Sequence, residues 1–264
     1  MKNLKRVFVF LVSLLVLISC QKEKESKPIS TVDQSSRLKY TLVDVIPANS
    51  LSLFGTYWNN LYPWGSDHNG SARMRAQNIS ASGGVLTLTS YAGSVSGKPA
   101  IHYFSGTIHA KTLVKVEDAW PLWRITGEFQ CASVRGTWPA FWLTGYIQWP
   151  PESDIMEFKG STTCWTNTYK NESGNWSSIG SVVSSPGNWH TYTIWMAKSS
   201  ASNVKIEYWI DGVKKATHTG GGFMNQPMWL IIDYQMEGSS GAPGPTGTTY
   251  MKARNVRVQK SATL

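Results

Sequence analysis

From about Leu38 onward, apolar and polar residues alternate in short runs that are separated by Gly, Asn, Ser and Pro. A period of two with many β-branched and aromatic residues is typical of β-strands, and no window shows a helical period of about 3.6. Asp211-Gly212, between two such runs, predicts a β-hairpin. The pattern therefore predicts an all-β chain of antiparallel strands, a sandwich or jelly roll, without repeats or a second domain. The clearest predicted strands are 83–91, 125–134, 153–158, 189–197, 204–212, 228–236 and 253–259.

The first 20 residues have the pattern of a lipoprotein signal peptide. Three positive charges in Met1–Arg6 precede the 12-residue apolar run Val7–Ile18, which is too short to span a bilayer comfortably. The run ends in LISC, which resembles a bacterial lipobox, so Cys20 is predicted to carry a lipid anchor. An ordinary signal peptide with an incidental Cys is the alternative. Residues 21–40 are polar and predict a tether, which places the folded domain, 41–264, at a bacterial outer membrane or cell surface.

The composition is that of a globular chain of 264 residues, 41% hydrophobic and 16% charged. Its 13 Trp and 11 Tyr suit either a β-sandwich core or a groove that stacks the flat faces of sugars. The net charge is +9, and the first 37 residues hold seven Lys/Arg against three acids. No basic run or nucleic-acid-binding motif accompanies it, so no nucleic acid partner is predicted. The mildly basic remainder suits an anionic polysaccharide or a cell envelope, or serves solubility alone.

Cysteine and histidine usage predicts no cofactor and no metal ligands. Apart from Cys20, the chain has Cys131 and Cys164, both in strand-like segments, and the sequence leaves open whether they form a disulfide. The five His are scattered, and no Cys/His spacing resembles a zinc site. A structural calcium ion cannot be read from the sequence.

Three acids stand within six positions of one predicted strand, in the segment ESDIMEFKG. Because successive side chains of a regular strand alternate between faces, Glu152 and Asp154 share a face and Glu157 points to the other. One extra residue at Ile155–Met156, a β-bulge, would bring Glu157 onto the face of the other two acids. Met156 would then be the residue out of phase. We therefore predict a bulge at this point of the strand.

Three acids on one face repel one another and raise at least one pKa, a cost tolerated mainly where the acids have a function. Retaining glycoside hydrolysis needs a carboxylate nucleophile and a protonated carboxyl about 5–5.5 Å apart. Glu152 and Glu157 would lean toward each other past Asp154, which would hydrogen-bond Glu152 and fix its orientation. A calcium site or a solvated edge strand is the alternative interpretation of this spacing.

Two neighbouring segments carry a resemblance to a known family. GTWPAFWLTG (136–145) and ESDIMEFKG (152–160) resemble the W-P-A-x-W segment and the E-x-D-x-x-E strand of glycoside hydrolase family 16. The spacing is similar to the laminarinase, agarase, porphyranase and carrageenase branches rather than to lichenases, whose motif is one residue shorter. Other segments similar to family strands, in the same order, are NISASGGVLTLTS, HYFSGTIHAK, ITGEFQ, WHTYTIWM, IEYWIDG, QPMWLIIDYQMEG and ARNVRV.

The resemblance spans roughly residues 50–259 and makes 41–264 the catalytic domain. It implies a concanavalin A-like jelly-roll sandwich of two antiparallel sheets, an open substrate cleft, and retaining, endo-acting hydrolysis. Glu152 would be the nucleophile, Glu157 the general acid/base and Asp154 the assisting residue. One departure from the family is Ser153, which replaces the usual Ile on the core-facing side.

The substrate-binding residues are predicted on two grounds. Tryptophans flank the acidic strand, where at least one belongs to the core and the others stack sugars, and the resemblance places further cleft positions on neighbouring strands. By alternation, Arg73 shares a face with Ser71 and Arg75, which suits sulfate or carboxylate groups, although a structural or outward-facing arginine explains it as well. The predicted residues are Trp138, Trp142, Trp149, His109, Arg73, Trp165, Asp233 and Gln235.

Together these features predict a lipid-anchored, monomeric endo-β-glycanase that cuts a β-1,3-glucan or an algal galactan. The basic balance and the arginines favour an acidic galactan. Two other classes of protein remain as alternatives. A non-catalytic carbohydrate-binding lipoprotein would have lost one of the two Glu, and both are present. A polysaccharide lyase would need a Tyr/His or Lys base at a uronate, and the intact acid triplet argues against it.

Overall fold

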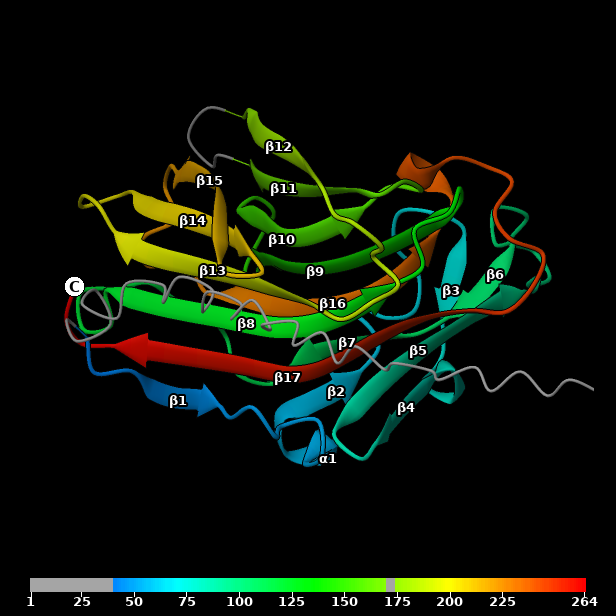
Figure 1. Ribbon diagram of the computed structural model, residues 1–264, viewed down its shortest axis with the longest axis horizontal. Helices are drawn as coiled ribbons and strands as arrows, with labels where there is room; N and C mark the ends of the chain where they lie inside the picture. The colour runs from blue at the N-terminus through cyan, green and yellow to red at the C-terminus, as the bar shows by residue number, and fades with distance from the viewer. Residues whose placement is uncertain (1–39, 170–173) are drawn as a thin grey trace, which may run out of the picture. The chain divides into compact units, whose positions relative to one another are not determined.

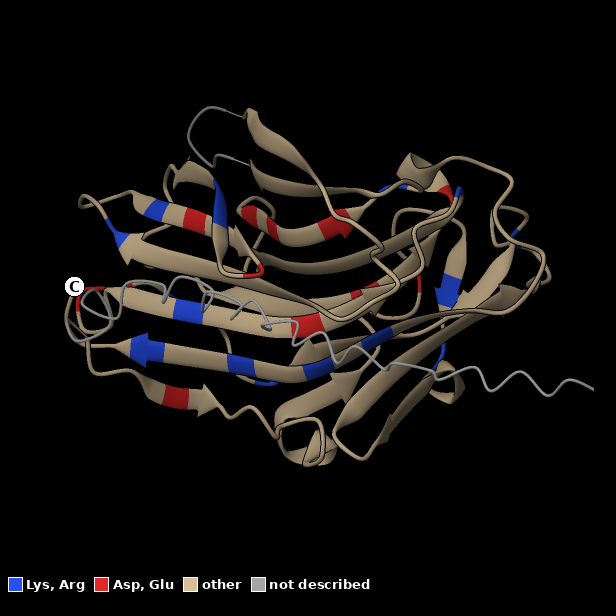
Figure 2. Cartoon of the chain, viewed as in Figure 1, with Lys and Arg blue, Asp and Glu red and all other residues tan. Residues whose placement is uncertain are grey.

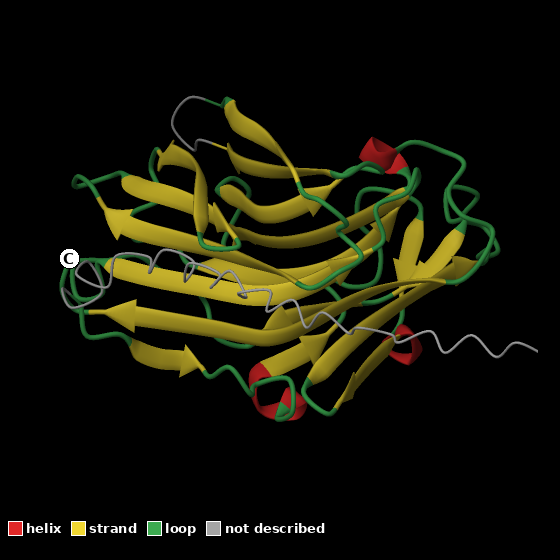
Figure 3. Ribbon diagram, in the orientation of Figure 1, coloured by secondary structure: helices red, strands yellow, loops and turns green. Residues whose placement is uncertain are grey.

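The computed structural model describes residues 40–169 and 174–264, which are built almost entirely from β-strands (Figures 1 and 3). The signal peptide, Cys20 and nearly all of the tether lie outside the described residues. Within them, the strands form a 10-stranded and a 7-stranded sheet, and every pair is antiparallel except β3–β6. No described helix is long and apolar enough to cross a bilayer. The jelly-roll prediction of two antiparallel sheets is confirmed.

The 10-stranded sheet follows the order β15-β14-β13-β8-β17-β5-β6-β3, with β1 added to β17 and β4 to β5. Its strands are β15 (Val213–Gly220), β14 (Val204–Ile210), β13 (His190–Lys198), β8 (Leu122–Cys131), β17 (Thr249–Ser261), β5 (Val85–Ala92), β6 (Tyr103–Ser105), β3 (Ala72–Met74), β1 (Val43–Ile46) and β4 (Ile79–Ser82).

The 7-stranded sheet follows the order β12-β11-β10-β9-β16-β7-β2. Its strands are β12 (Trp176–Val182), β11 (Thr163–Tyr169), β10 (Glu152–Phe158), β9 (Thr137–Gly145), β16 (Met228–Met236), β7 (Thr107–Ala110) and β2 (Trp58–Asn60). The helical elements are single turns: α1 (Phe54–Tyr57) and the 3₁₀ turns η2 (Ala76–Asn78) and η3 (Gly238–Ser240).

The core lies between the two sheets. Alternation predicts it well, because β14 buries every second residue, whereas the residues between them are exposed or half-buried. Aromatic rings close the layer: Phe129 of β8 lies 4.8 Å from Phe141 of β9, centroid to centroid. The predicted hairpin at Asp211-Gly212 joins β14 to β15, and both residues have positive φ, 49° and 76°, as a type I′ turn requires.

Two predictions about this domain are refined. The predicted strand 125–134 ends at Cys131 and begins earlier, at Leu122, because its pairing with β13 and β17 covers that range. Cys131 and Cys164 are both buried free thiols, and the Cys131 Sγ lies 3.6 Å from the Met156 Sδ. Figure 2 shows that lysine, arginine, aspartate and glutamate residues are spread along strands of both sheets.

Candidate active site

Strand β10 carries a bulge at the predicted place. On the side of β9, Asp154 pairs with Trp142 and Met156 pairs with Phe141, so Ile155 is the extra residue. The residue without a partner on β9 is thus Ile155 and not Met156, which corrects the prediction. Both side chains are buried in the core. The extra residue reverses the alternation of faces beyond it, so the strand can be apolar on one side and acidic on the other.

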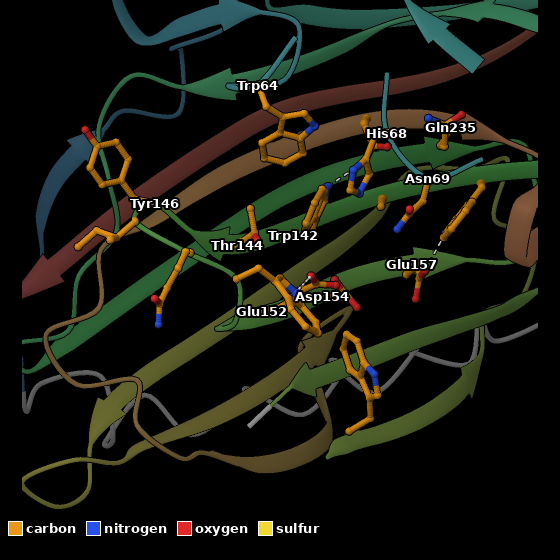
Figure 4. A pocket seen from close by; sticks show the side chains of 18 residues that line it. Trp64, His68, Asn69, Trp142, Thr144, Tyr146, Glu152, Asp154, Glu157 and Gln235 are labelled. Atoms are coloured by element: carbon orange, nitrogen blue, oxygen red, sulfur yellow. Dashed lines mark hydrogen bonds between the residues drawn. The ribbon is translucent and has the colours of Figure 1, made fainter. Parts of the chain in front are cut away.

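On the side of β11 the same irregularity lies between Asp154, which pairs with Asn167, and Glu157, which pairs with Trp165. As a result Glu152, Asp154 and Glu157 line one cleft of about 610 Å³. Figure 4 shows the three acids on one side of this cleft, with Trp64 and His68 across from them and Trp142 between.

Glu152 is held by a tryptophan. The Trp149 Nε1 donates a hydrogen bond of 2.7 Å to the Glu152 Oε2. Burial raises the pKa of Glu152 to about 7; the Trp149 bond and the Lys159 charge lower it, and the Glu157 charge raises it. In the substrate-free cleft, Glu152 therefore holds a proton far more readily than an ordinary glutamate.

Asp154 is buried between the two glutamates. Its Oδ2 accepts a 2.8 Å hydrogen bond from the Asn167 Nδ2. Burial raises the pKa of Asp154 well above its ordinary value, and the charges of Glu152 and Glu157 raise it further. Asp154 therefore favours its neutral form, and Asn167 is the neighbour whose hydrogen bond favours the carboxylate.

Glu157 has the most donors of the three acids. Its Oε1 accepts a 2.7 Å hydrogen bond from the Trp138 Nε1, and its Oε2 accepts one of 2.7 Å from the Asn167 Nδ2. The Lys159 Nζ lies 3.0 Å from the same Oε2. Two hydrogen bonds and an ion pair therefore fix the Glu157 carboxyl group in the cleft.

A fourth acid, Asp233 of β16, is buried in the cleft wall. Its Oδ1 accepts a 2.8 Å hydrogen bond from the Trp142 Nε1, and its Oδ2 one of 2.7 Å from the Tyr62 hydroxyl. Burial raises the pKa of Asp233 to about 7; the two hydrogen bonds lower it, and the charges of Glu157 and Glu152 raise it. We call Glu152, Asp154, Glu157 and Asp233 the acid cluster. The charges of Glu152 and Glu157 raise the pKa values of both aspartates in this cluster.

No three described His, Cys, Asp or Glu side chains are arranged to hold a metal ion. Glu152 and Glu157, which the bulge brings into one cleft, are the kind of carboxyl pair that glycoside hydrolysis uses.

Comparison with known proteins identifies the family. The chain matches the model of glycosyl hydrolases family 16 over residues 123–252. It is 46% identical over 232 residues to the galactan endo-beta-1,3-galactanase of Flammulina velutipes, covering 82% of this chain and 90% of that protein. The chain belongs to glycosyl hydrolase family 16. It is an endo-acting glycoside hydrolase.

Other family 16 proteins are more distant from it. The endo-1,3-1,4-beta-glycanase EglC of Rhizobium meliloti is 30% identical over 130 residues, which cover 47% of this chain and 27% of EglC. Porphyranase B of Zobellia galactanivorans has the same fold, with a TM-score of 0.66 at 15% identity over 89% of this chain and 96% of that one. The endo-1,3-beta-glucanase of Streptomyces sioyaensis has a TM-score of 0.64 at 22% identity, over 84% and 96%.

Most residues predicted to bind substrate do line the family 16 cleft. They are Trp138, Trp142, Trp149, Asp233 and Gln235. Trp142 is buried and ties β9 to Asp233, whereas Trp149 is 53% exposed. Gln235 accepts hydrogen bonds from the backbone N–H groups of Ala72 and Met236, so it also fastens the cleft floor.

Three predicted residues are not among those that line the cleft. Arg73 lies on β3, which pairs with β6 of the other sheet, and its Nη1 is 3.1 Å from the Asp67 Oδ2. His109 is buried, and its Nδ1 bonds the Leu61 carbonyl at 2.8 Å. Trp165 is half-buried beside the Lys159 ammonium. Alternation predicted the face of Arg73, but it does not tell which sheet a strand joins. His109 and Trp165 were predicted from the family resemblance, which does not fix how deeply a side chain is buried.

Sequence reasoning missed Asn167, which donates to two of the acids, and several residues that line the cleft. Asn167 follows Trp165 on β11 at the alternation step that faces the acids, so a closer application of the period of two would have found it. Trp64 and His68 lie in a loop without periodicity, and the sequence holds no signal for them. In the fold, Trp64 stacks on Tyr62 with ring centroids 5.2 Å apart and planes 4° from parallel. The missed residues that line the cleft include Trp64, His68, Asn69, Thr144, Tyr146, Ile147, Gln148 and Trp176.

Proposed function

We propose that this family 16 enzyme hydrolyses internal β-1,3 linkages of a neutral galactan with retention of configuration. The observation that carries the substrate is the 46% identity to an endo-β-1,3-galactanase over 90% of its length. The observation that supports the mechanism is the bulge that brings Glu152 and Glu157 into one cleft.

In this mechanism, Glu157 donates its proton to the glycosidic oxygen while the Glu152 carboxylate attacks the anomeric carbon. The bond to the leaving chain breaks, and a glycosyl ester forms on Glu152. Glu157, now a carboxylate, takes a proton from a water that attacks the same carbon and releases Glu152. Asp154 and Asn167 stabilise the negative charge as it passes between the two glutamates.

The mechanism needs a proton on Glu157 and a charge on Glu152 when the sugar reacts. In the substrate-free cleft, burial raises the pKa of Glu152 to about 7, so its carboxylate is not fully formed near neutral pH. We infer that Glu152 gives up its proton as the sugar enters.

Aromatic rings on both sides of the acids would hold the polysaccharide. Trp149 contacts Tyr169 at 4.5 Å, centroid to centroid, and Tyr169 contacts Trp176 at 4.9 Å. Trp64 stands across the cleft with 47% of its surface exposed. Pre-ordered flat rings bind the apolar faces of sugars at little cost in side-chain entropy, which suits an open cleft for an internal stretch of chain.

The charge of the cleft favours a neutral substrate over the acidic galactan that the sequence suggested. Among the described residues that line it, four are acids and none is Lys or Arg. Arg73 is occupied by Asp67 and does not reach it. A sulfate or carboxylate beside the acid cluster would be repelled, and Lys159, the cation beside the cluster, is already paired with Glu157.

The test is a panel of a neutral β-1,3-galactan, a β-1,3-glucan and a sulfated algal galactan, with product anomers followed by NMR. We expect oligosaccharides from the neutral galactan, with the β-anomer appearing first. Cleavage of the glucan alone would reject the substrate and leave the mechanism standing. An α-anomer first would reject retention, unsaturated ends would indicate a lyase, and binding without cleavage would indicate a lectin.

We also propose that the enzyme is anchored by a lipid on Cys20, which lies outside the described residues. The support is the LISC lipobox after a short apolar run. Cys20→Ser expressed in a bacterial host should move the enzyme from the membrane fraction to the soluble fraction. Mass spectrometry of the wild-type N-terminus should show a diacylglyceryl group, and an unmodified Cys20 would reject the anchor.

A further inference from the structure

The core-facing side of the acidic strand carries a buried polar group of its own. Ser153, between Glu152 and Asp154 in sequence, has no exposed surface. Its Oγ lies 2.7 Å from the hydroxyl of Tyr208, which belongs to β14 in the opposite sheet. The Tyr208 hydroxyl also lies 2.6 Å from the Thr168 Oγ1, which in turn is 3.1 Å from the His218 Nδ1. We call Ser153, Thr168, Tyr208 and His218 the inter-sheet cluster.

The direction of these hydrogen bonds follows from counting hydrogens. The Tyr208 hydroxyl donates to the Asn167 carbonyl oxygen at 2.9 Å, which uses its one hydrogen. Ser153 and Thr168 must therefore donate to the Tyr208 oxygen, and the Thr168 oxygen accepts from the His218 Nδ1–H. Each hydroxyl group then donates one hydrogen bond. The donors form a chain that ends at the backbone carbonyl of Asn167.

Asn167 links this chain to the acids. It pairs with Asp154 in the register of β10 and β11, and its Nδ2 donates to both Asp154, at 2.8 Å, and Glu157, at 2.7 Å. The Tyr208 hydroxyl therefore contacts both Ser153, which precedes Asp154 in the strand, and Asn167, which lies opposite Asp154.

An apolar residue at position 153 would fill the core more simply. Buried hydroxyls cost free energy unless they are hydrogen-bonded, and this cluster crosses between the sheets in the middle of an apolar layer. The bulge gives a reason for it: regular pairing between β10 and β11 is interrupted between Asp154 and Glu157. Where the ladder is interrupted, another contact must fix how far Asn167 stands from the acids.

We propose that Tyr208 is a positioning residue, which holds Ser153 and Asn167 in place across the bulge so that Asn167 can donate to Asp154 and Glu157 together. The proposal rests on the catalytic roles given above to the acids, but not on the identity of the polysaccharide. It also explains the departure at Ser153, because an isoleucine there would leave the Tyr208 oxygen without that donor.

The decisive comparison is Tyr208→Phe against Tyr192→Phe. Tyr192 of β13 is equally buried in the same core, but its hydroxyl has no hydrogen-bond partner among the described residues. On the best substrate of the panel, Y208F should lower kcat about 10-fold with KM changed less than twofold, because slight displacement of a reacting group is costly. Y192F should match the wild type in both.

The second readout is pH. The charged groups that act on Asp154 are Glu152, Glu157 and Lys159, and the hydrogen bond from Asn167 lowers its pKa. Displacing Asn167 should therefore raise the pKa of Asp154. The acid limb of the Y208F rate profile should therefore move to higher pH, while that of Y192F stays in place. A carboxyl ¹³C NMR titration should show the same shift without substrate, so the inference can be judged even if no galactan is cut.

Ser153→Ala is the milder variant and decides the matter if Y208F does not fold. It removes one donor to Tyr208 and should lower kcat about 3-fold, with a smaller shift of the acid limb in the same direction. If Y208F or, failing that, S153A lowers only thermal stability and leaves kcat, KM and the carboxyl titration unchanged, the cluster is structural and the proposal is wrong.

Discussion

The cleft and the outer face of the 10-stranded sheet use acidic side chains in opposite ways. On the outer face, acids and cations of neighbouring strands form exposed pairs: Glu128 lies 2.7 Å from Arg254, and Asp44 lies 2.7 Å from Arg257. Figure 2 shows these basic and acidic positions on adjacent strands. In the cleft, the four members of the acid cluster gather in one site. Lys159 is the cation beside them: it contacts Glu157 and lowers the pKa values of Glu152 and Asp154.

The difference separates charge used for solubility from charge used for chemistry. An exposed ion pair is screened by water and is worth about 0–1 kcal/mol. Buried like charges raise one another's pKa values and destabilise the folded state, so a fold retains them where a reaction needs protons near neutral pH. Substitutions in the cleft should therefore alter activity strongly, and those on the outer face should alter little.

The largest effect is expected from removing either glutamate. Glu152→Gly removes the nucleophile and Glu157→Gly the acid, so each should lower kcat/KM by roughly 10³-fold or more on the polysaccharide. Initial rates on the cleaved galactan measure this. The matched control is Glu128→Gln, an acid of the outer face, which should keep full activity.

Azide separates the two roles. In E152G it can enter the space left by the nucleophile and attack the anomeric carbon from the opposite face to a normal product, giving an α-glycosyl azide. In E157G it would attack the glycosyl ester and give a β-glycosyl azide. Reversed anomers would mean that the roles of the two glutamates are exchanged.

A smaller loss is expected from Asn167→Ala. One amide group donates to two acids, so its removal should lower kcat about 10–100-fold with little change in KM. Asn255→Gly is the control, because the Asn255 Nδ2 also donates to an acid, Glu128, on the outer face. Glycine is chosen there since Asn255 has a φ of 52°. Equal activity of both variants would show that Asn167 only fills space.

How much of this was predictable differs between the two regions. Period-two alternation is a local property, so the strands, the hairpin at Asp211-Gly212 and even the bulge in β10 could be predicted. The three acids followed, because an acid on the wrong face of a strand is a visible conflict. The position of Arg73 could not be predicted in the same way. Alternation predicts the face of its strand, but the sheet that β3 joins depends on long-range pairing. Trp64 lies in a loop, and no local pattern encodes where a loop meets the cleft.

Asp233 offers a test through stability rather than rate. Its folded pKa of about 7 lies above the ordinary 3.8, so between these values the folded state binds a proton that the unfolded state has lost. Stability should therefore fall as pH rises from about 4 to about 7. Asp233→Asn removes this dependence, because an amide can accept from Trp142 and donate to Tyr62 without becoming charged.

The measurement is Tm by calorimetry at pH 5 and pH 8. D233N and the wild type should be close at pH 5, and D233N should melt about 3–6 °C higher at pH 8. Asp44→Asn, on the outer face, is the control and should not gain stability at high pH. Parallel curves for D233N and the wild type would show that Asp233 is not a strained buried acid.

The smallest effect is expected at Arg257, whose guanidinium bonds both carboxylate oxygens of Asp44 at 2.7 and 3.0 Å. Both side chains are more than a third exposed, so water screens the pair despite its good geometry. Arg257→Gln should cost at most about 1 kcal/mol, the cost should shrink in 1 M salt, and kcat and KM should stay within twofold. A larger loss of activity would mean that the outer face of β17 affects the cleft. Charge on the outer face could then no longer be assigned to solubility alone.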